Sequence, residues 1–238
     1  MNILLKIFRG TKGNGFYQTF RYESNTDADT IATALTELNA KEPLTDIEGK
    51  AAEPILWECN CLQKRCGACA MVINKKPALA CSVMIRTFQS GSTVLLEPLK
   101  KFPGIRDLAV DREAMTRNLG ELSVWLAGED KRVPSDVSLT YEASRCLQCG
   151  CCLEVCPNFA VESTFTGMAA AVPLTRILGM EGINSDKAKG YEKRVFEGCG
   201  KSLACRDICP AGIDIERMLV NSNAIAVWKR MRKIKEEI

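Results

Sequence analysis

One short run of cysteines constrains this chain more than any other feature. The segment CLQCGCCLEVCP has the spacing C-x2-C-x2-C-x3-C followed by proline, from Cys146 to Pro157. This spacing is typical of bacterial ferredoxins, in which three close thiolates bind one iron–sulfur cluster and the fourth binds another. The segment therefore predicts a tight loop that folds around one cluster and has a second cluster nearby.

The segment CGKSLACRDICP, residues 199–210, repeats this pattern 53 positions later. Three of the four cysteines recur, and Ser202 stands at the position that corresponds to Cys149. The repeat predicts two clusters that exchange a ligand. The predicted [4Fe–4S] ligands are Cys146, Cys149, Cys152 and Cys209. The other cluster is left with the three thiolates of Cys156, Cys199 and Cys205.

The serine at position 202 decides the type of the second cluster. A cube that lacks a thiolate at one corner loses that iron, so three thiolates predict a [3Fe–4S] cluster. A serine oxygen is a harder and more basic ligand than a thiolate, and suits iron in such a cluster less well. The alternative is a four-iron cluster that is completed by Ser202 or by water.

The first group of cysteines has the spacing C-x4-C-x2-C-x11-C, which is the plant-type [2Fe–2S] spacing with a short last gap. Its predicted ligands are Cys61, Cys66, Cys69 and Cys81. We expect the last of them to arrive from a later strand, and the small residues Gly67 and Ala68 to let backbone N–H groups approach the sulfurs. Cys59 and Cys151 remain, and we interpret both as small buried side chains. Cys59 is also an alternative to Cys61 if the loop is rearranged.

Two other uses of clustered cysteines fit less well. Disulfide frameworks belong mainly to short secreted chains, whereas this chain has an odd number of cysteines, 13, and no recognisable signal peptide. Its first residues, MNILLKIFRG, form a short apolar run that we interpret as a strand. Zinc sites often include histidine, and this chain has none. Iron–sulfur clusters in a reducing compartment are the better interpretation.

The segment before the second cysteine group predicts a β-grasp ferredoxin domain, residues 1–103. ILLKIF and GFYQTFRY alternate as paired strands do, and MVIN, PALACSVMI and TVLLEPL are further short strand-like runs. TDADTIATALTELNA predicts one helix, capped by Thr26 or Asp27.

The remainder predicts an all-α domain with two clusters, residues 104–238, and the chain as a whole an α+β fold. Pro98, Pro103 and Gly104 are expected to break regular structure in the connecting segment EPLKKFPGIRDLAVDR. Helices are expected in DREAMTRNLGELSVWLAG, after Pro173, and in IDIERMLVNSNAIAVWKRMRKI. Bound metal should supply much of the stability of this domain.

The composition indicates electron transfer rather than substrate chemistry within this chain. It contains no P-loop, no dinucleotide fingerprint and no histidine for acid–base catalysis. A net charge of +3 argues against nucleic acid as a partner, and no apolar run is long enough to span a membrane. We interpret the basic residues from Lys229 to Lys235 as a solvated helix end, with contact to anionic lipid or an acidic partner as the alternative.

Three cluster motifs in this order, one of them lacking a ligand, resemble the iron–sulfur subunits of succinate dehydrogenases and fumarate reductases. The resemblance covers nearly the whole chain and includes the segment GIRDLAVDR. It implies an electron-transfer subunit without catalytic residues, in a succinate:quinone oxidoreductase or quinol:fumarate reductase. It also implies a flavoprotein partner that carries FAD and the dicarboxylate chemistry. Electrons would pass between FAD, the three clusters and a quinone in a membrane-anchor subunit.

Several positions depart from the family pattern. One branch has tryptophans after the first Cys-Pro and a histidine in the last group, where this chain has Ala160, Val161 and Gly200. The segment CPNFAVESTFTGMAA instead resembles the branch with a single cytochrome b anchor that holds haem b and uses menaquinone. The first loop, residues 61–65, reads CLQKR and lacks the glycine that is common in the family. Candidate docking residues are Phe159, Phe165 and Met168, with burial in the core as the alternative.

These features lead to one preferred function and two alternatives. The preferred function is a subunit that is bound through its partners at the cytoplasmic face of the cell membrane. The first alternative is a subunit of a soluble flavoprotein that reduces fumarate or another enoate with a thiol or protein donor. The second is a free-standing ferredoxin, which the near-neutral charge and the separate [2Fe–2S] domain disfavour.

Overall fold

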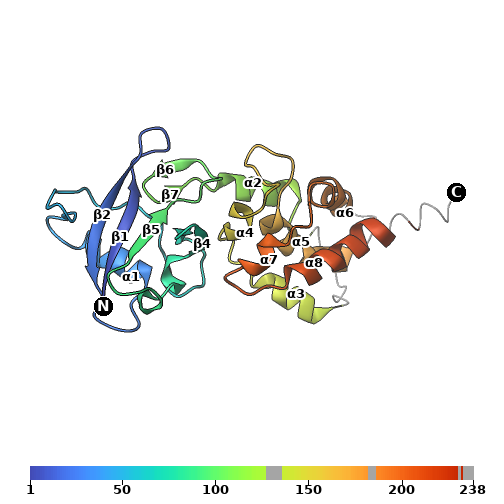
Figure 1. Ribbon diagram of the computed structural model, residues 1–238. Helices are drawn as coiled ribbons and strands as arrows, with labels where there is room; N and C mark the ends of the chain where they lie inside the picture. Colours follow the sequence, from blue (N-terminus) through green and yellow to red (C-terminus); the bar gives the residue numbers. More distant parts are fainter. Residues whose placement is uncertain (127–135, 182–185, 230–231, 233–238) are drawn as a thin grey trace. The chain divides into compact units, whose positions relative to one another are not determined.

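The computed structural model describes residues 1–126, 136–181, 186–229 and 232 (Figure 1). The chain forms two compact units, Met1–Asp111 and Arg112–Ile238. This division lies later than the limit at residue 103 that the sequence suggested. The reason is a short strand pair that follows residue 103 and belongs to the first unit.

A five-stranded sheet forms the body of the first unit, with the strand order β2-β1-β5-β3-β4 (Figure 1). The strands are β1 (Asn2–Arg9), β2 (Phe16–Glu23), β3 (Ala70–Ile73), β4 (Lys76–Leu79) and β5 (Thr93–Glu97). β5 lies parallel to β1, and the other neighbours are antiparallel. This mixed sheet with one helix confirms the predicted ferredoxin-like N-terminal domain.

The helix of this unit, α1 (Ile31–Asn39), begins later than the sequence suggested. Its N-cap is Thr30, whose hydroxyl accepts a hydrogen bond from the backbone N–H of Thr33 at 3.1 Å. The predicted cap at Thr26 or Asp27 was wrong. The Thr26 hydroxyl instead donates to the carboxylate of Asp29 at 2.7 Å, which ties it into the preceding turn.

The segment expected to be an irregular linker contains a short antiparallel pair, β6 (Gly104–Arg106) and β7 (Ala109–Val110). The prediction that regular structure is absent here was therefore wrong. Asp107, at the turn, is only 3% exposed. Its carboxylate accepts backbone hydrogen bonds from Gly10 at 2.8 Å and Leu56 at 2.9 Å. A buried carboxylate needs such donors, and these donors fasten the β6–β7 pair to the first unit.

The described residues of the second unit form helices and no strand, as predicted (Figure 1). The helices are α2 (Glu113–Glu121), α3 (Val137–Ser144), α4 (Cys151–Glu154), α5 (Met168–Glu181), α6 (Asp186–Tyr191), α7 (Ala204–Asp207) and α8 (Ile215–Asn223). Two π-helical stretches, Glu192–Phe196 and Ala224–Trp228, continue α6 and α8. Most of the basic tail at 229–235 falls outside the described residues. The helix expected at 111–128 is shorter than predicted, because α2 ends at Glu121 and the described residues 122–126 are not helical. No described helix has the length and apolarity that crossing a bilayer requires.

The helix α5 contains Pro173 instead of beginning after it, so that prediction was wrong. A proline inside a helix has no N–H for the carbonyl four residues earlier, which here belongs to Ala169. The side chain of Gln148 supplies the missing donor, because its Nε2 lies 2.7 Å from that carbonyl oxygen. A hydrogen bond from outside the helix therefore compensates for the proline.

Candidate iron–sulfur centres

The first group of cysteines lies on a loop of the β-grasp unit. Cys81 lies in the 3₁₀ turn Ala80–Ser82 directly after β4, rather than in a strand as expected. Its Sγ atom is 3.4 Å from that of Cys69. Backbone N–H groups of residues 63–65 donate to the sulfurs of Cys61 and Cys81 at 3.2 to 3.4 Å. Such donors stabilise thiolates, so this loop fits the charge of a [2Fe–2S] cluster.

The backbone of this loop turns through left-handed conformations without the family's usual glycine. Leu62 has φ 53°, and Lys64, at the position of that glycine, has φ 58°. Each such residue costs roughly 1–2 kcal/mol relative to the right-handed conformation. In this left-handed conformation the N–H groups of residues 63–65 point toward the cysteine sulfurs.

The thiols of this loop differ in their acidity. Backbone N–H donation from Gln63, and then from Arg65, lowers the pKa of Cys61 to about 7. Burial raises the pKa of Cys69 to about 12, and the hydrogen bond and charge of the neighbouring Cys81 side chain act in the same direction. The exposed end of the loop therefore favours the thiolate, while the buried end requires bound metal to displace the proton.

Four cysteines from two distant segments line one cavity of the second unit. They are Cys146, Cys149, Cys152 and Cys209. The rest of the lining is mainly apolar and includes Met168, Val172 and Ile213. These four cysteines are the ones that the sequence predicted for the [4Fe–4S] cluster. A thiolate-lined, apolar cavity is chemically suited to hold such a cluster.

The other three predicted ligands of this unit also lie near one another. Burial raises the pKa of Cys205 to about 11, and the charges of Cys156 and Cys199 act in the same direction. Cys156 is thus grouped with two cysteines of the second loop. Among the described residues, no three His, Cys, Asp or Glu side chains are arranged to hold a single metal ion. In a cubane-type cluster each thiolate binds a different iron, so the thiolates of this unit need not converge on one point.

The two cysteine loops repeat each other in backbone conformation as well as in sequence. The helices α4 and α7 begin 53 positions apart, and each follows a left-handed residue, Gly150 with φ 84° and Leu203 with φ 56°. Two residues earlier, Gln148 has φ 51° and Lys201 has φ 56°. The internal repeat that the sequence indicated is therefore a repeat of structure.

The loops differ in the surroundings of the position where the ligand changes. Cys149 is buried at 8% exposure, whereas Ser202 is exposed. A hydrogen bond from the Cys151 thiol lowers the pKa of Cys149 to about 7, and the positive charge of Arg112 also contributes. Cys149 thus has an environment that favours a thiolate, and Ser202 faces solvent.

The two leftover cysteines have different environments. Cys151 is fully buried, as predicted, but Cys59 is exposed, so the expectation of a buried Cys59 was wrong. No disulfide joins any of the thirteen cysteines, all of which lie in described residues.

The predicted docking residues are part of the core. Phe159, Phe165 and Met168 are all at most 5% exposed. Phe165 packs against Gly198, where a Cβ atom would come within 2.8 Å of its side chain. The tryptophan and histidine positions of the other branch carry no compensating aromatic residue in this chain.

Sequence reasoning missed two features next to the cysteines. The first is Gln148, whose Nε2 lies 3.2 Å from Cys146 Sγ. Its position between two cysteines is a signal, but its contact with α5 is not visible in the sequence. The second is a cavity of about 230 Å³ beside Cys199, lined by residues that include Phe196 and Trp228. Both of these aromatic residues lie in the π-helical stretches, which are often found at functional sites.

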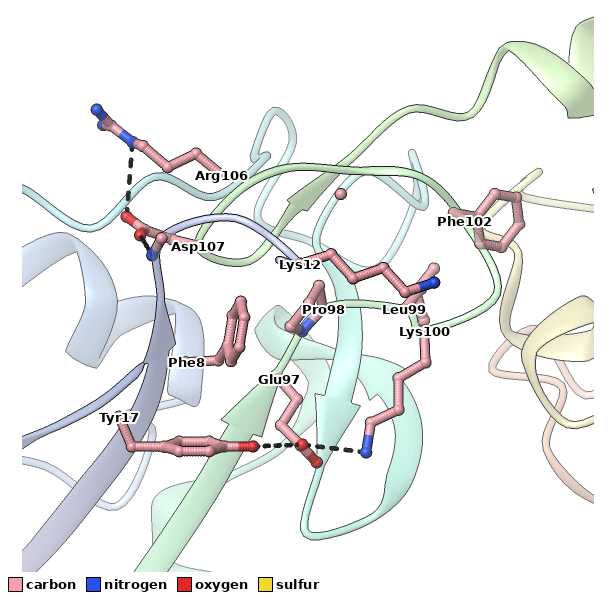
Figure 2. A pocket seen from close by; sticks show the side chains of 12 residues that line it. Phe8, Lys12, Tyr17, Glu97, Pro98, Leu99, Lys100, Phe102, Arg106 and Asp107 are labelled. Atoms are coloured by element: carbon pink, nitrogen blue, oxygen red, sulfur yellow. Dashed lines mark hydrogen bonds and ion pairs between the residues drawn. The ribbon is translucent and has the colours of Figure 1, made fainter. Parts of the chain in front are cut away.

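A second cavity of about 230 Å³ lies in the β-grasp unit and contains no cysteine (Figure 2). Figure 2 shows Phe8 and Pro98 on its walls and Glu97 between Tyr17 and Lys100. The Glu97 carboxylate accepts a hydrogen bond from the Tyr17 hydroxyl at 2.8 Å and pairs with Lys100 at 3.0 Å. The polar groups of this cavity are therefore bound largely to one another.

Two protein-family models match the chain. A 2Fe-2S iron-sulfur cluster binding domain matches residues 4–117, and a 4Fe-4S dicluster domain matches residues 142–213. The two matches cover the same segments in which the structure gathers the cysteines.

The succinate dehydrogenase iron-sulfur subunit of Bacillus subtilis is 34% identical over 206 residues, which cover 81% of this chain and 79% of that protein. This chain belongs to the family of succinate dehydrogenase and fumarate reductase iron–sulfur subunits. The fumarate reductase iron-sulfur subunit of Wolinella succinogenes is 30% identical over 166 residues, covering 63% of this chain and 69% of that protein. A chain of the Mycobacterium smegmatis Sdh1 complex shares the fold, with a TM-score of 0.77 at 21% identity, over 94% of this chain and 96% of that one.

Membership of this family confirms the predicted role of an electron-transfer subunit in an oxidoreductase complex. It also confirms that the subunit carries iron–sulfur clusters, because both matched domain models are cluster-binding domains. The relatives named above do not favour the soluble alternative.

Proposed function

We propose that this subunit carries electrons between the FAD of a flavoprotein subunit and a quinone at a membrane-anchor cytochrome b. The observation that carries the proposal is that each of the two cysteine loops contributes one cysteine to the group formed by the other. Cys209 of the second loop lines the cavity of the first, and Cys156 of the first loop lies near Cys199 and Cys205. Two clusters bound in this way are adjacent, which one-electron transfer between them requires.

We assign the ligand sets that the cysteine spacing predicts, and the grouping in the second unit supports two of them. The [2Fe–2S] cluster takes Cys61, Cys66, Cys69 and Cys81; the [4Fe–4S] cluster takes Cys146, Cys149, Cys152 and Cys209; the [3Fe–4S] cluster takes Cys156, Cys199 and Cys205. Support for the third set comes from Ser202, which is exposed where its counterpart Cys149 is buried. A serine hydroxyl that faces water is a poor ligand for a fourth iron.

In this proposal the [2Fe–2S] loop is the part of the chain that exchanges electrons with the flavoprotein. Residues 62–65 are exposed and carry the charges of Lys64 and Arg65, so a partner surface can approach the cluster ligands closely. FAD on that partner supplies two-electron chemistry on the dicarboxylate, and the clusters of this chain accept or deliver single electrons.

The quinone end is the cavity beside Cys199. Trp228 and Val220 in its lining are 45% and 54% exposed, which suits contact with an apolar anchor subunit. A quinone ring needs an apolar wall and a nearby cluster, and Phe196 and Leu203 line the same cavity as Cys199. We assign menaquinone, an anchor that holds haem b, and the cytoplasmic face of the membrane on the sequence resemblance described above.

Low-temperature EPR of the native complex, first oxidised and then reduced in steps, tests this function. We expect a near-isotropic [3Fe–4S] signal in the oxidised sample and about nine irons per chain, the sum of one cluster of each type. Co-purification of a flavoprotein together with a cytochrome b is the expected partner set. A second low-potential [4Fe–4S] centre in place of the [3Fe–4S] signal, or a flavoprotein without cytochrome b, would favour the soluble alternative.

A further inference from the structure

Gln148 places a hydrogen-bond donor between a cluster loop and a helix. Its side-chain Nε2 lies 3.2 Å from Cys146 Sγ and 2.7 Å from the carbonyl oxygen of Ala169 in α5. An amide nitrogen carries two hydrogens, so it can serve both acceptors. The bond to the carbonyl fixes which end of the amide faces the cavity, because a carbonyl oxygen only accepts.

The carbonyl of Ala169 is available because of Pro173. In an ordinary helix the N–H four residues later would take this carbonyl, and proline has none. Gln148 is therefore held by a carbonyl oxygen that is free only because residue 173 is proline. This arrangement links a residue of the cysteine loop to a helix that lies outside both cysteine loops.

Two features indicate that holding the Gln148 amide in this position costs conformational and solvation free energy. Its Oε1 is buried and makes no hydrogen bond within the described part of the chain. Its backbone is left-handed, with φ 51°. The corresponding Lys201 has the same backbone turn but is exposed, and its ammonium group lies 5.4 Å from the Phe196 ring. The two loops therefore share a strained backbone, and it is the side chain that differs.

We propose that Gln148 raises the reduction potential of the [4Fe–4S] cluster, and that Pro173 positions Gln148 for this role. The proposal rests on the proposed function, in which Cys146 is a ligand of that cluster. A bound cluster would gain one electron on reduction, and the negative charge on its ligand sulfurs, Cys146 Sγ among them, would increase. An N–H donor at Cys146 Sγ stabilises this added charge, so it favours the reduced form, and no proton has to be taken up.

The test is an EPR-monitored redox titration of the purified complex. Gln148→Met keeps the length of the side chain and removes both donors. We expect it to retain all irons and to lower the reduced-to-oxidised ratio of the [4Fe–4S] cluster about tenfold at a fixed potential, which corresponds to 59 mV for one electron. The matched control is Gln89→Met, because the Gln89 side chain is exposed and lies outside the cysteine loops. We expect this control to leave the [4Fe–4S] midpoint potential unchanged.

Pro173→Ala tests the positioning step without touching a cysteine or Gln148. The restored N–H competes for the Ala169 carbonyl, so Gln148 loses its anchor, and we expect a smaller shift in the same direction. In the Gln148→Met background, Pro173→Ala should add no further shift, because the residue it positions is gone. If Pro173 acted only through general packing, the shift in midpoint potential caused by Pro173→Ala would instead be the same in both backgrounds.

Each outcome bears on one of the two proposals. An unchanged [4Fe–4S] midpoint in an intact Gln148→Met complex overturns the role of Gln148. If that variant does not assemble, Pro173→Ala decides: no shift, or a shift to higher potential, overturns the proposal. If the unaltered complex lacks a [4Fe–4S] signal altogether, the proposed function fails instead.

Discussion

The loop that begins at Cys146 and the loop that begins at Cys199 follow the same backbone course but meet different surroundings. Both turn through two left-handed residues into a four-residue helix. In the first loop the variable ligand position is a buried cysteine, and in the second it is an exposed serine. The comparison teaches that one backbone course can present different side chains at matching positions. In our proposal these side chains set how many irons each loop helps to bind and how strongly the sulfurs are hydrogen bonded.

The largest expected effect comes from breaking the exchange of ligands between the loops. Cys209→Ala alters the second loop, but we expect it to remove the [4Fe–4S] cluster of the first, with a loss of about four irons per chain. Iron analysis and EPR of the purified complex measure this loss. Ser202→Ala, in the same loop, is the control and should retain every iron. Loss of the [3Fe–4S] signal alone in Cys209→Ala would mean that each loop binds its own cluster.

A second change makes the loops alike. Ser202→Cys supplies the missing thiolate on a backbone that already matches, so we expect a gain of about one iron and disappearance of the oxidised [3Fe–4S] EPR signal. The potential of the converted cluster should fall by on the order of 100 mV or more, within the wide range that cluster type controls. Retention of the original signal would indicate that an exposed residue at this position cannot reach the fourth corner.

A third change tests the shared backbone turn. Gly150 has φ 84°, and a side chain there costs roughly 1–2 kcal/mol. We therefore expect Gly150→Ala to lower the melting temperature of the iron-loaded protein by about 2–8 °C for a chain of this size. Leu203→Gly, at the matching position, relieves the same strain and should not lower it. Equal melting temperatures for Gly150→Ala and the unaltered protein would contradict the role of the left-handed turn.

The smallest expected effect concerns the cysteine that follows that turn. Cys151 corresponds to Ala204 in the second loop, so Cys151→Ala copies one loop into the other. We expect all irons to be retained and a loss of stability of about 1 kcal/mol, because a buried side chain becomes smaller. The exposed Cys59 gives the control, and Cys59→Ala should change stability by less than about 0.5 kcal/mol. A loss of iron in either variant would make that cysteine a ligand.

The sequence predicted the parts of this protein that local spacing determines. Cysteine spacing predicted both cluster loops and their repeat, because most ligands of such clusters come from a few neighbouring residues. Alternating apolar residues identified β1 and β2, since one face of the sheet is buried.

The missed features depend on partners that are distant in the sequence. The sequence predicts a helix only after Pro173, because the donor that compensates for this proline, Gln148, lies in another segment. It predicts a linker in place of the β6–β7 pair, because the hydrogen bonds that hold Asp107 come from Gly10 and Leu56. The exposure of Cys59 likewise depends on which segments pack around it, and a single residue gives no sign of that.

The cavity lined by Cys146, Cys149 and Cys152 also takes Cys209, Ile213 and Ile215 as its walls. During synthesis on the ribosome the chain emerges from its N-terminus, so this cavity has no far wall until the last part of the chain has been made. The β-grasp loop, whose cysteines all precede residue 82, is under no such delay. The β-grasp loop can therefore be complete before this cavity is, and a chain that stops short of Cys209 lacks one of the four cysteines that line it.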